Sequence, residues 1–136
     1  MIEVVCGVLI QNGKCLIARR NYGSSKGFYE FPGGKVELNE TKEEALKREW
    51  KEELGIEIKN ISYLASSQDQ QDYAFSLTCF TCQSDECVEF SNAHDQLIWT
   101  TPDHIYDFNF FESDQKLVDK LKEIWPCIQG QKKPKY

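Results

Sequence analysis

The sequence predicts an α+β fold, in which a mixed β-sheet packs against two helices, and three features support this prediction. Short runs of β-branched, aromatic and other apolar residues, each bounded by turn residues, occur before residue 35 and again after residue 60. One segment of helical periodicity separates the two groups of runs, and a second segment follows them. The 136 residues suffice for one core without metal or disulfide cross-links. We therefore expect one domain over residues 1–129 and a flexible tail over residues 130–136, where no core-forming pattern continues.

The strands are predicted from β-type runs and from the turns between them. Asn12-Gly13 has the sequence of a two-residue hairpin joining the first two strands. Pro32 ends the third run, and Gly33-Gly34 predicts a sharp turn or a close approach of the backbone to another group. The predicted strands comprise residues 2–10, 15–20, 28–31, 61–66, 73–82, 87–90 and 97–100.

Two helices complete the predicted fold. The first spans residues 42–54, because Thr41 and Glu44 fit a capping box and Gly55 stands where helices commonly end. The second follows Ser113, which can cap it, and its apolar residues recur at the spacing of one helix face. These apolar residues are Leu117, Val118, Leu121, Ile124 and Trp125.

Charge and hydropathy exclude several functional classes. The net charge of -6 argues against binding of a nucleic acid polymer through a basic face, although a small anionic ligand can still bind at a local site. The longest nearly apolar run covers only residues 4–10, far short of a membrane span. Glu3 stands where a secretory signal would need positive charge. We therefore expect a cytoplasmic protein without membrane partners.

The six cysteines are expected to be reduced thiols in this setting. Cys79 and Cys82 have the spacing of a zinc knuckle, but they lie within a predicted strand. An offset of three sends strand side chains to opposite faces, so two buried structural cysteines are favoured over a shared zinc ion.

The first helix has an unusual distribution of charge. Glu49, Glu52 and Glu53 border the apolar stripe of the helix, and their like-charge pairs should destabilise it by a few tenths of a kcal/mol each. A solvated acidic face is the ordinary explanation. Carboxylates clustered beside a buried face would also suit a hard divalent cation, which prefers oxygen ligands. Arg48 is expected to offset part of the charge by pairing with Glu44 and Glu52.

Residues 34–56, GKVELNETKEEALKREWKEELGI, resemble the Nudix box, G-x5-E-x7-R-E-U-x-E-E-x-G-U, in which U is a bulky apolar residue. Outside the box, FYEFPGGKVE, Ala18-Arg19-Arg20 and WTTPDHI resemble the MutT-type nucleoside triphosphate pyrophosphohydrolases, including their CTP branch. The resemblance implies the Nudix fold, a mixed sheet sandwiched between helices (α/β/α). The box positions are filled by Gly34, Glu40, Arg48, Glu49, Trp50, Glu52, Glu53, Gly55 and Ile56.

The resemblance also implies the roles of residues and a cofactor, Mg²⁺, for which Mn²⁺ can substitute. Glu49 and Glu53 are expected as the principal metal ligands, and Glu52 as a further ligand or as the base that takes a proton from water. Arg48 would orient the glutamates, and the carbonyl of Gly33 or Gly34 would complete the ligand set.

The resemblance also predicts substrate contacts. The resemblance places Arg20, Phe31, Gly33, Lys35 and Asp114 at the substrate, where residues contact phosphate or base. Each has an ordinary alternative: Arg20 and Lys35 as solvated cations, Phe31 as a core aromatic, and Asp114 as an acid in the first helical turn.

One position departs from the MutT pattern. Many MutT-like proteins have a glutamate six residues before the tryptophan of the late strand, and here that position is Ala93. The neighbouring His94 is expected to make a structural hydrogen bond rather than to act in catalysis. The identity of the general base therefore stays open.

The resemblance implies Mg²⁺-dependent hydrolysis of a nucleoside triphosphate to a nucleoside monophosphate and pyrophosphate. The substrate would be a modified deoxynucleotide or a CTP-type nucleotide, bound by a monomer or homodimer. Two alternatives remain: hydrolysis of another nucleoside diphosphate derivative, such as a nucleotide sugar or dinucleoside polyphosphate, and a catalytically weak module that senses nucleotides.

Overall fold

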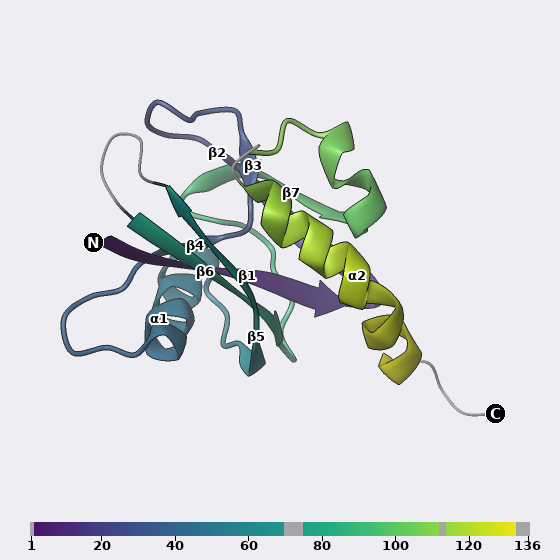
Figure 1. Ribbon diagram of the computed structural model, residues 1–136. Coiled ribbons are helices and arrows are strands. Elements are labelled where there is room, and N and C mark those ends of the chain that lie inside the picture. The colour runs from purple at the N-terminus through teal and green to yellow at the C-terminus, as the bar shows by residue number, and fades with distance from the viewer. Residues whose placement is uncertain (1, 70–74, 112–113, 133–136) are drawn as a thin grey trace.

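The computed structural model describes residues 2–69, 75–111 and 114–132. Its sheet has two helices on opposite faces (Figure 1). The helices are α1 (Lys42–Leu54) and α2 (Gln115–Lys132), with a short 3-10 helix, η1 (Pro102–Asp107), before α2. The strands are β1 (Ile2–Gln11), β2 (Lys14–Arg20), β3 (Tyr29–Glu30), β4 (Gly33–Lys35), β5 (Lys59–Asp69), β6 (Phe75–Gln83) and β7 (His94–Thr100). The predicted α+β class and the α/β/α sandwich are confirmed.

The sheet is mixed because β1 and β6 run parallel while the other pairings are antiparallel. Strands β3, β2, β1, β6 and β5 follow one another across it, with β4 paired to β1 and β7 paired to β2. Parallel neighbours need a long connection, and here α1 lies within the chain that joins β1 to β6. Strand β1 is therefore the centre on which the other elements assemble.

Two cores form because alternate residues of β1 point to opposite faces. Val5 and Leu9 pack on the side of α1, against Leu46 and Trp50. Cys6 and Val8, which alternate with them, pack on the side of α2, whose buried residues are Leu117, Val118 and Leu121. Cys79 and Cys82 fall in different cores, as the strand prediction requires, and all six cysteines are free.

The predicted turns and caps are present. Asn12 and Gly13 have φ angles of 52° and 76°, as a tight hairpin requires. The capping box of Thr41 and Glu44 is formed, and Gly55 ends α1 in the left-handed conformation with φ 71°.

The structure corrects several boundaries. Residues 87–90 form no strand, because Cys87 and Phe90 are exposed and only Val88 packs against the core. Helix α2 continues to Lys132, so residues 130–132 of the predicted tail are helical. The predicted strand of residues 28–31 is shorter, and Gly33-Gly34 belongs to β4 instead of a turn. Ser113 and residues 73–74 lie outside the described residues.

Close backbone approach explains the first glycine of this pair. A Cβ on Gly33 would overlap the carbonyl oxygen of Val5, so only glycine allows β4 to pair with β1 at this point. Among the described residues, no helix is long and apolar enough to cross a membrane.

Candidate active site

Helix α1 is fixed on the sheet by its tryptophan. Trp50 is fully buried, and its Nε1 donates a hydrogen bond of 3.0 Å to the carbonyl oxygen of Pro32. The backbone N–H of Gly7 on β1 donates to the same oxygen at 2.9 Å. One carbonyl between β3 and β4 thus ties the helix to the central strand. Because the apolar stripe faces the sheet, the glutamates beside it are held at the edge of the helix–sheet contact.

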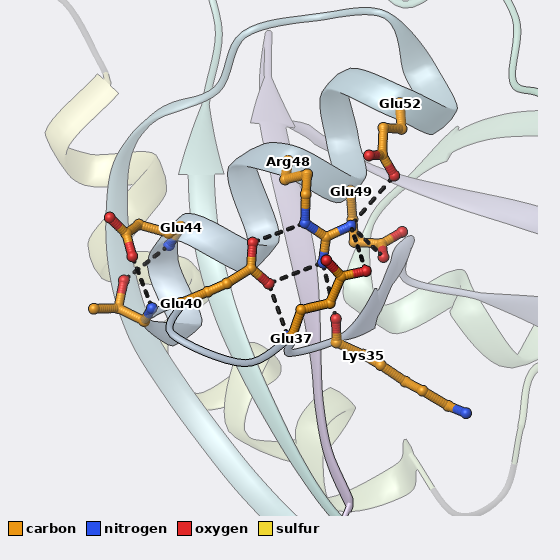
Figure 2. A network of polar contacts seen from close by, with 8 residues as sticks. Lys35, Glu37, Glu40, Glu44, Arg48, Glu49 and Glu52 are labelled. Atoms are coloured by element: carbon orange, nitrogen blue, oxygen red, sulfur yellow. Dashed lines mark hydrogen bonds and ion pairs between the residues drawn. The ribbon is translucent and has the colours of Figure 1, made fainter.

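Arg48 organises the acidic side chains of α1 and of the loop before it (Figure 2). Its guanidinium donates through Nε to Glu40 Oε2 at 2.7 Å and through Nη2 to Glu40 Oε1 at 2.9 Å, a bidentate pair. Nη1 donates to Glu49 at 3.0 Å and to Glu52 at 3.3 Å. Nη2 also donates to the carbonyl oxygen of Lys35 at 3.0 Å. Arg48 therefore joins α1, its preceding loop and β4.

The predicted partners of Arg48 are only partly correct. The pair with Glu52 is formed, but Glu44 is absent from the network because its Oε1 accepts the Thr41 N–H of the capping box at 2.8 Å. Glu40 takes its place. The hydrogen bonds from Arg48 lower the pKa of the Glu40 carboxyl to about 2. In return, the carboxylates of Glu40 and Glu49 raise the pKa of Arg48.

Glu49 and Glu53 lie next to each other beside β4. Burial, followed by a hydrogen bond to Glu49 and the negative charges of Glu49, Glu30 and Glu52, raises the pKa of Glu53 to about 9. A Cβ on Gly34 would overlap the carboxylate of Glu49, so the second glycine leaves room for that side chain. Glu52 stands further out, with 59% of its side chain exposed.

The donor set fits a hard divalent cation. Three carboxylates gather at one end of α1, and a buried, mutually repelling pair is the environment in which a cation is favoured over protons. Within the described residues, no three His, Cys, Asp or Glu side chains already converge on one point. Glu49 and Glu52 are instead turned toward Arg48 (Figure 2), so a cation bound here would compete with the guanidinium for their oxygens.

A second polar cluster lies on β2, β3 and β7, and its central residue, Glu30, was missed by the sequence prediction. Glu30 Oε1 accepts a hydrogen bond from Arg20 Nε at 2.9 Å, and Oε2 lies 2.9 Å from His94 Nε2. Its charge contributes to the raised pKa of Glu53, which places Glu30 near the acidic helix. An acidic residue among the aromatic residues of a buried strand was the available signal, since a buried charge requires partners.

Two aromatic rings lie against the guanidinium of Arg20. Its Cζ lies 5.2 Å from the ring centroid of Tyr22 and 5.4 Å from that of Phe111, within the range of cation–π contact. The ring of Phe111 is stacked on Phe28 at 4.9 Å. Arg20 is thus an ordered cation rather than a freely solvated one.

The other predicted substrate residues lie in different environments. Asp114 is buried, and this burial, together with the charge of Glu30, raises the pKa of its carboxyl to about 7 although Arg20 acts in the opposite direction. Phe31 is 2% exposed and contacts Phe110 edge-on, so it packs as a core aromatic. The side chain of Lys35 extends away from the Arg48 network (Figure 2). The structure places Arg20 in contact with Glu30, and both charges act on Asp114.

The segment before β7 has no carboxylate at residue 93. The carbonyl oxygen of Ala93 accepts a hydrogen bond from the Asn21 N–H at 3.4 Å. His94 is buried, with Nδ1 2.7 Å from Ser91 Oγ and Nε2 bonded to Glu30. The predicted structural hydrogen bond is therefore confirmed, and there are two such bonds.

Surface shape alone does not locate the site. Two hollows of about 410 and 450 Å³ are both lined by Gln11, Asn12 and Cys87. Neither includes a residue of α1.

The box geometry, the sandwich fold and the acidic end of α1 together define a Nudix hydrolase. The NUDIX domain family matches residues 1–123, and the chain belongs to this family. It is therefore an enzyme of the Nudix hydrolase class.

Individual relatives narrow the comparison. The chain is 35% identical over 133 residues to a CTP pyrophosphohydrolase of Escherichia coli K12, covering 91% of this chain and 93% of that protein. It is 39% identical over 82 residues to an 8-oxo-dGTP diphosphatase of Proteus vulgaris, covering 58% of this chain and 73% of that protein. The solution structure of the E. coli ORF135 protein superposes with a TM-score of 0.77 at 32% identity, covering 91% of this chain and 90% of that one.

A more distant structure confirms the fold alone. The MutT protein of Methanosarcina mazei Go1 superposes with a TM-score of 0.78 at 21% identity, covering 97% of this chain and 96% of that one.

Proposed function

We propose that the protein is a Mg²⁺-dependent nucleoside triphosphate pyrophosphohydrolase of the MutT type, which releases a nucleoside monophosphate and pyrophosphate. The observation that carries the proposal is the placement of Glu49, Glu52 and Glu53 at one end of α1. A polyphosphate is repelled by such a group, and a divalent cation between the two removes the repulsion.

The charged residues at this end of α1 would bind the metal, orient one another and accept a proton. Glu49, Glu53 and the carbonyl oxygen of Gly33 or Gly34 would hold Mg²⁺, with Glu52 as a further ligand. When bound, the metal polarises the phosphoryl oxygens and lowers the pKa of a bound water. Arg48 fixes the direction of the Glu49 and Glu52 side chains through its hydrogen bonds. The Glu52 side chain is 59% exposed and that of Glu49 15%, which supports Glu52 as the group that would accept the proton of the attacking water.

The hydrolysis forms one bond to phosphorus and breaks another. The water oxygen bonds to phosphorus, and the bond from that phosphorus to the bridging oxygen breaks. The proton lost by the water is taken by the base, and the bridging oxygen leaves with pyrophosphate or with the monophosphate. Catalysis in such a reaction is mainly positioning and charge stabilisation.

Arg20 and Asp114 are the proposed substrate contacts. The guanidinium of Arg20 can pair with a phosphate, and Asp114, when ionised, can accept hydrogen bonds from an exocyclic amino group. Cytosine, adenine and guanine have such a group, whereas uracil and thymine do not. Gly33 and Lys35 would face the phosphates, and Phe31 would contact the base only through its edge because it is 2% exposed.

The relatives support a CTP-type or oxidised purine triphosphate as substrate. One relative named a CTP pyrophosphohydrolase covers 91% of this chain, and another is named an 8-oxo-dGTP diphosphatase. Two alternatives belong in the same test: a Nudix hydrolase for another nucleoside diphosphate derivative, and a weak nucleotide sensor, which the alanine at position 93 favours.

The test is a panel of ordinary, oxidised and methylated triphosphates, nucleotide sugars and dinucleoside polyphosphates, each with Mg²⁺ and with Mn²⁺. Release of pyrophosphate rather than orthophosphate from a triphosphate is the expected result. Turnover of a nucleotide sugar alone would replace the proposal by the first alternative. Tight nucleotide binding without turnover of any compound would replace it by the second.

A matched pair of variants tests the metal assignment within the same panel. We expect Glu53→Gln to remove most activity and to leave the folded structure intact, because it keeps the shape of the side chain and removes its charge. Glu57→Gln is the control, since Glu57 has 71% of its side chain exposed and, within the described residues, forms an ion pair only with Lys51. Near-normal rates for Glu53→Gln would contradict the role of Glu53 as a metal ligand.

A further inference from the structure

The turn of residues 91–94 touches both halves of the site, although it contains no carboxylate at residue 93. On one side it contacts the end of α1 that bears the acidic side chains. On the other side it contacts Glu30, the centre of the polar cluster on β3. A turn in contact with both halves can fix the distance between them.

Asn92 makes the contacts to the helix. The last carbonyls of an α-helix have no partner within the helix. The backbone N–H of Asn92 donates to the carbonyl oxygen of Glu53 at 2.8 Å, and its side-chain Nδ2 donates to that of Glu52 at 2.9 Å. Asn92 therefore caps, from a distant part of the chain, two of the three glutamates proposed to hold the metal.

His94 makes the contacts to the strand. Its side chain is fully buried, with Nδ1 bonded to Ser91 Oγ at 2.7 Å and Nε2 to Glu30 Oε2 at 2.9 Å. Ser91 Oγ also accepts the Ala93 N–H at 3.2 Å, which closes the turn on itself. Glu30 in turn holds Arg20 at 2.9 Å. The orientation of the Arg20 guanidinium thus depends on His94 through Glu30.

We propose that the turn of residues 91–94 is a positioning element with two separable effects. Asn92 positions the metal-binding end of α1, and His94 positions Glu30 and Arg20 for the nucleotide. This inference rests on the proposed function, and it assigns to neither Asn92 nor His94 a contact with the reacting atoms.

The first test concerns Asn92 and uses Mn²⁺ alone as the probe, measured by electron paramagnetic resonance or calorimetry without nucleotide. Asn92→Ala removes the hydrogen bond to Glu52, and loss of one such bond corresponds to about a threefold to tenfold change in an equilibrium constant. We expect Mn²⁺ binding to weaken by about that factor. Gln11→Ala is the control, because the Gln11 side-chain amide also donates to backbone carbonyls, those of Ser84 and Glu86 at 3.1 and 2.9 Å, and neither belongs to α1.

A second substitution keeps this test decisive if Asn92→Ala fails to fold. Asn92→Ser retains a residue favoured in turns, and its side chain is shorter by one carbon and the amide nitrogen. The same loss of Mn²⁺ affinity is expected. Mn²⁺ affinities within twofold of the unmodified protein in every folded Asn92 variant would overturn the role of Asn92.

The second test separates the two ring nitrogens of His94. His94→Asn places an amide near the position of Nδ1, so it can keep the bond to Ser91 and loses the bond to Glu30. His94→Gln reaches the position of Nε2 and can keep the bond to Glu30. Because a hydrogen bond to a charged group is at stake, we expect His94→Asn to raise KM about tenfold or more, and His94→Gln to raise it much less.

The control for these variants is His104→Gln, since His104 is exposed and bonds to Asp107 outside the site. Mn²⁺ affinity should stay within twofold in both His94 variants, a separation that a purely structural role would not produce. Equal KM values in His94→Asn and His94→Gln, or loss of Mn²⁺ affinity in either, would overturn the role of His94.

Failure of this inference can be told apart from failure of the proposed function. If the unmodified protein releases pyrophosphate from a triphosphate and the variants do not change as stated, only the positioning role falls. If it hydrolyses no triphosphate, the proposed function falls. Mn²⁺ binding, together with the affinity for a non-hydrolysable triphosphate analogue in place of KM, then still decides between the two outcomes for the turn.

Discussion

Replacement of Asp114 by asparagine should make the protein more stable at alkaline pH. Asp114 is 8% exposed, and burial and the charge of Glu30 raise the pKa of its carboxyl from 3.8 to about 7. The folded protein therefore keeps this proton over a pH range in which the unfolded chain releases it. Asparagine has the same shape and never ionises, so the variant does not lose stability at this position as the pH rises.

The sign and size of the effect follow from proton linkage. Between pH 3.8 and about 7 the folded state holds more protons than the unfolded state, so the free energy of unfolding falls as pH rises. Each pH unit in this window is worth about 1.4 kcal/mol, and the loss by pH 8.5 approaches roughly 4 kcal/mol. Above pH 7 both states are ionised at this position and the loss is constant.

Denaturant unfolding of both proteins at pH 4.5 and pH 8.5 measures the effect. Between the two pH values, the free energy of unfolding of Asp114→Asn should gain about 3 kcal/mol on that of the unmodified protein. The control is Asp119→Asn, because Asp119 is exposed on α2, which begins directly after Asp114. A relative gain below about 1 kcal/mol would show that the folded protein does not hold Asp114 as an acid, which would refute the argument from burial.

Three further substitutions test the architecture of the site. Gly34→Ala should weaken Mn²⁺ binding at least about tenfold, because its Cβ would overlap the Glu49 carboxylate; unchanged binding in a calorimetric titration would contradict this. Arg48→Lys should lower the free energy of unfolding by about 1–3 kcal/mol in denaturant unfolding, since an ammonium group lacks the guanidinium fork that holds Glu40; a loss below 0.5 kcal/mol, roughly the error, would speak against the network. Trp50→Phe should lower the free energy of unfolding by about 2 kcal/mol, because the hydrogen bond to Pro32 is lost and the ring is smaller. An unchanged free energy of unfolding would mean that this bond is not what ties α1 to the sheet.

Local rules were enough to predict most of the fold. The hairpin at Asn12-Gly13, the capping box at Thr41 and the end of α1 at Gly55 each depend on residues close together in the chain. The period of the pattern also placed Trp50 in the core and sent Cys79 and Cys82 to opposite faces of the sheet. The predicted strand at residues 87–90 was wrong because a strand also needs a neighbour and a face to bury, and neither is written in four residues.

The sequence by itself determined the acidic end of α1, because Glu49, Glu52 and Glu53 share a helix and helical spacing fixes their relation. It did not determine that Arg48 prefers Glu40 to Glu44, since that choice depends on how the preceding loop folds back. The joining of Glu30 to His94, 64 residues apart, and of Asn92 to Glu52, 40 residues apart, was decided only by strand pairing and loop placement. Such contacts arise when distant segments meet, and no local propensity encodes which ones will do so.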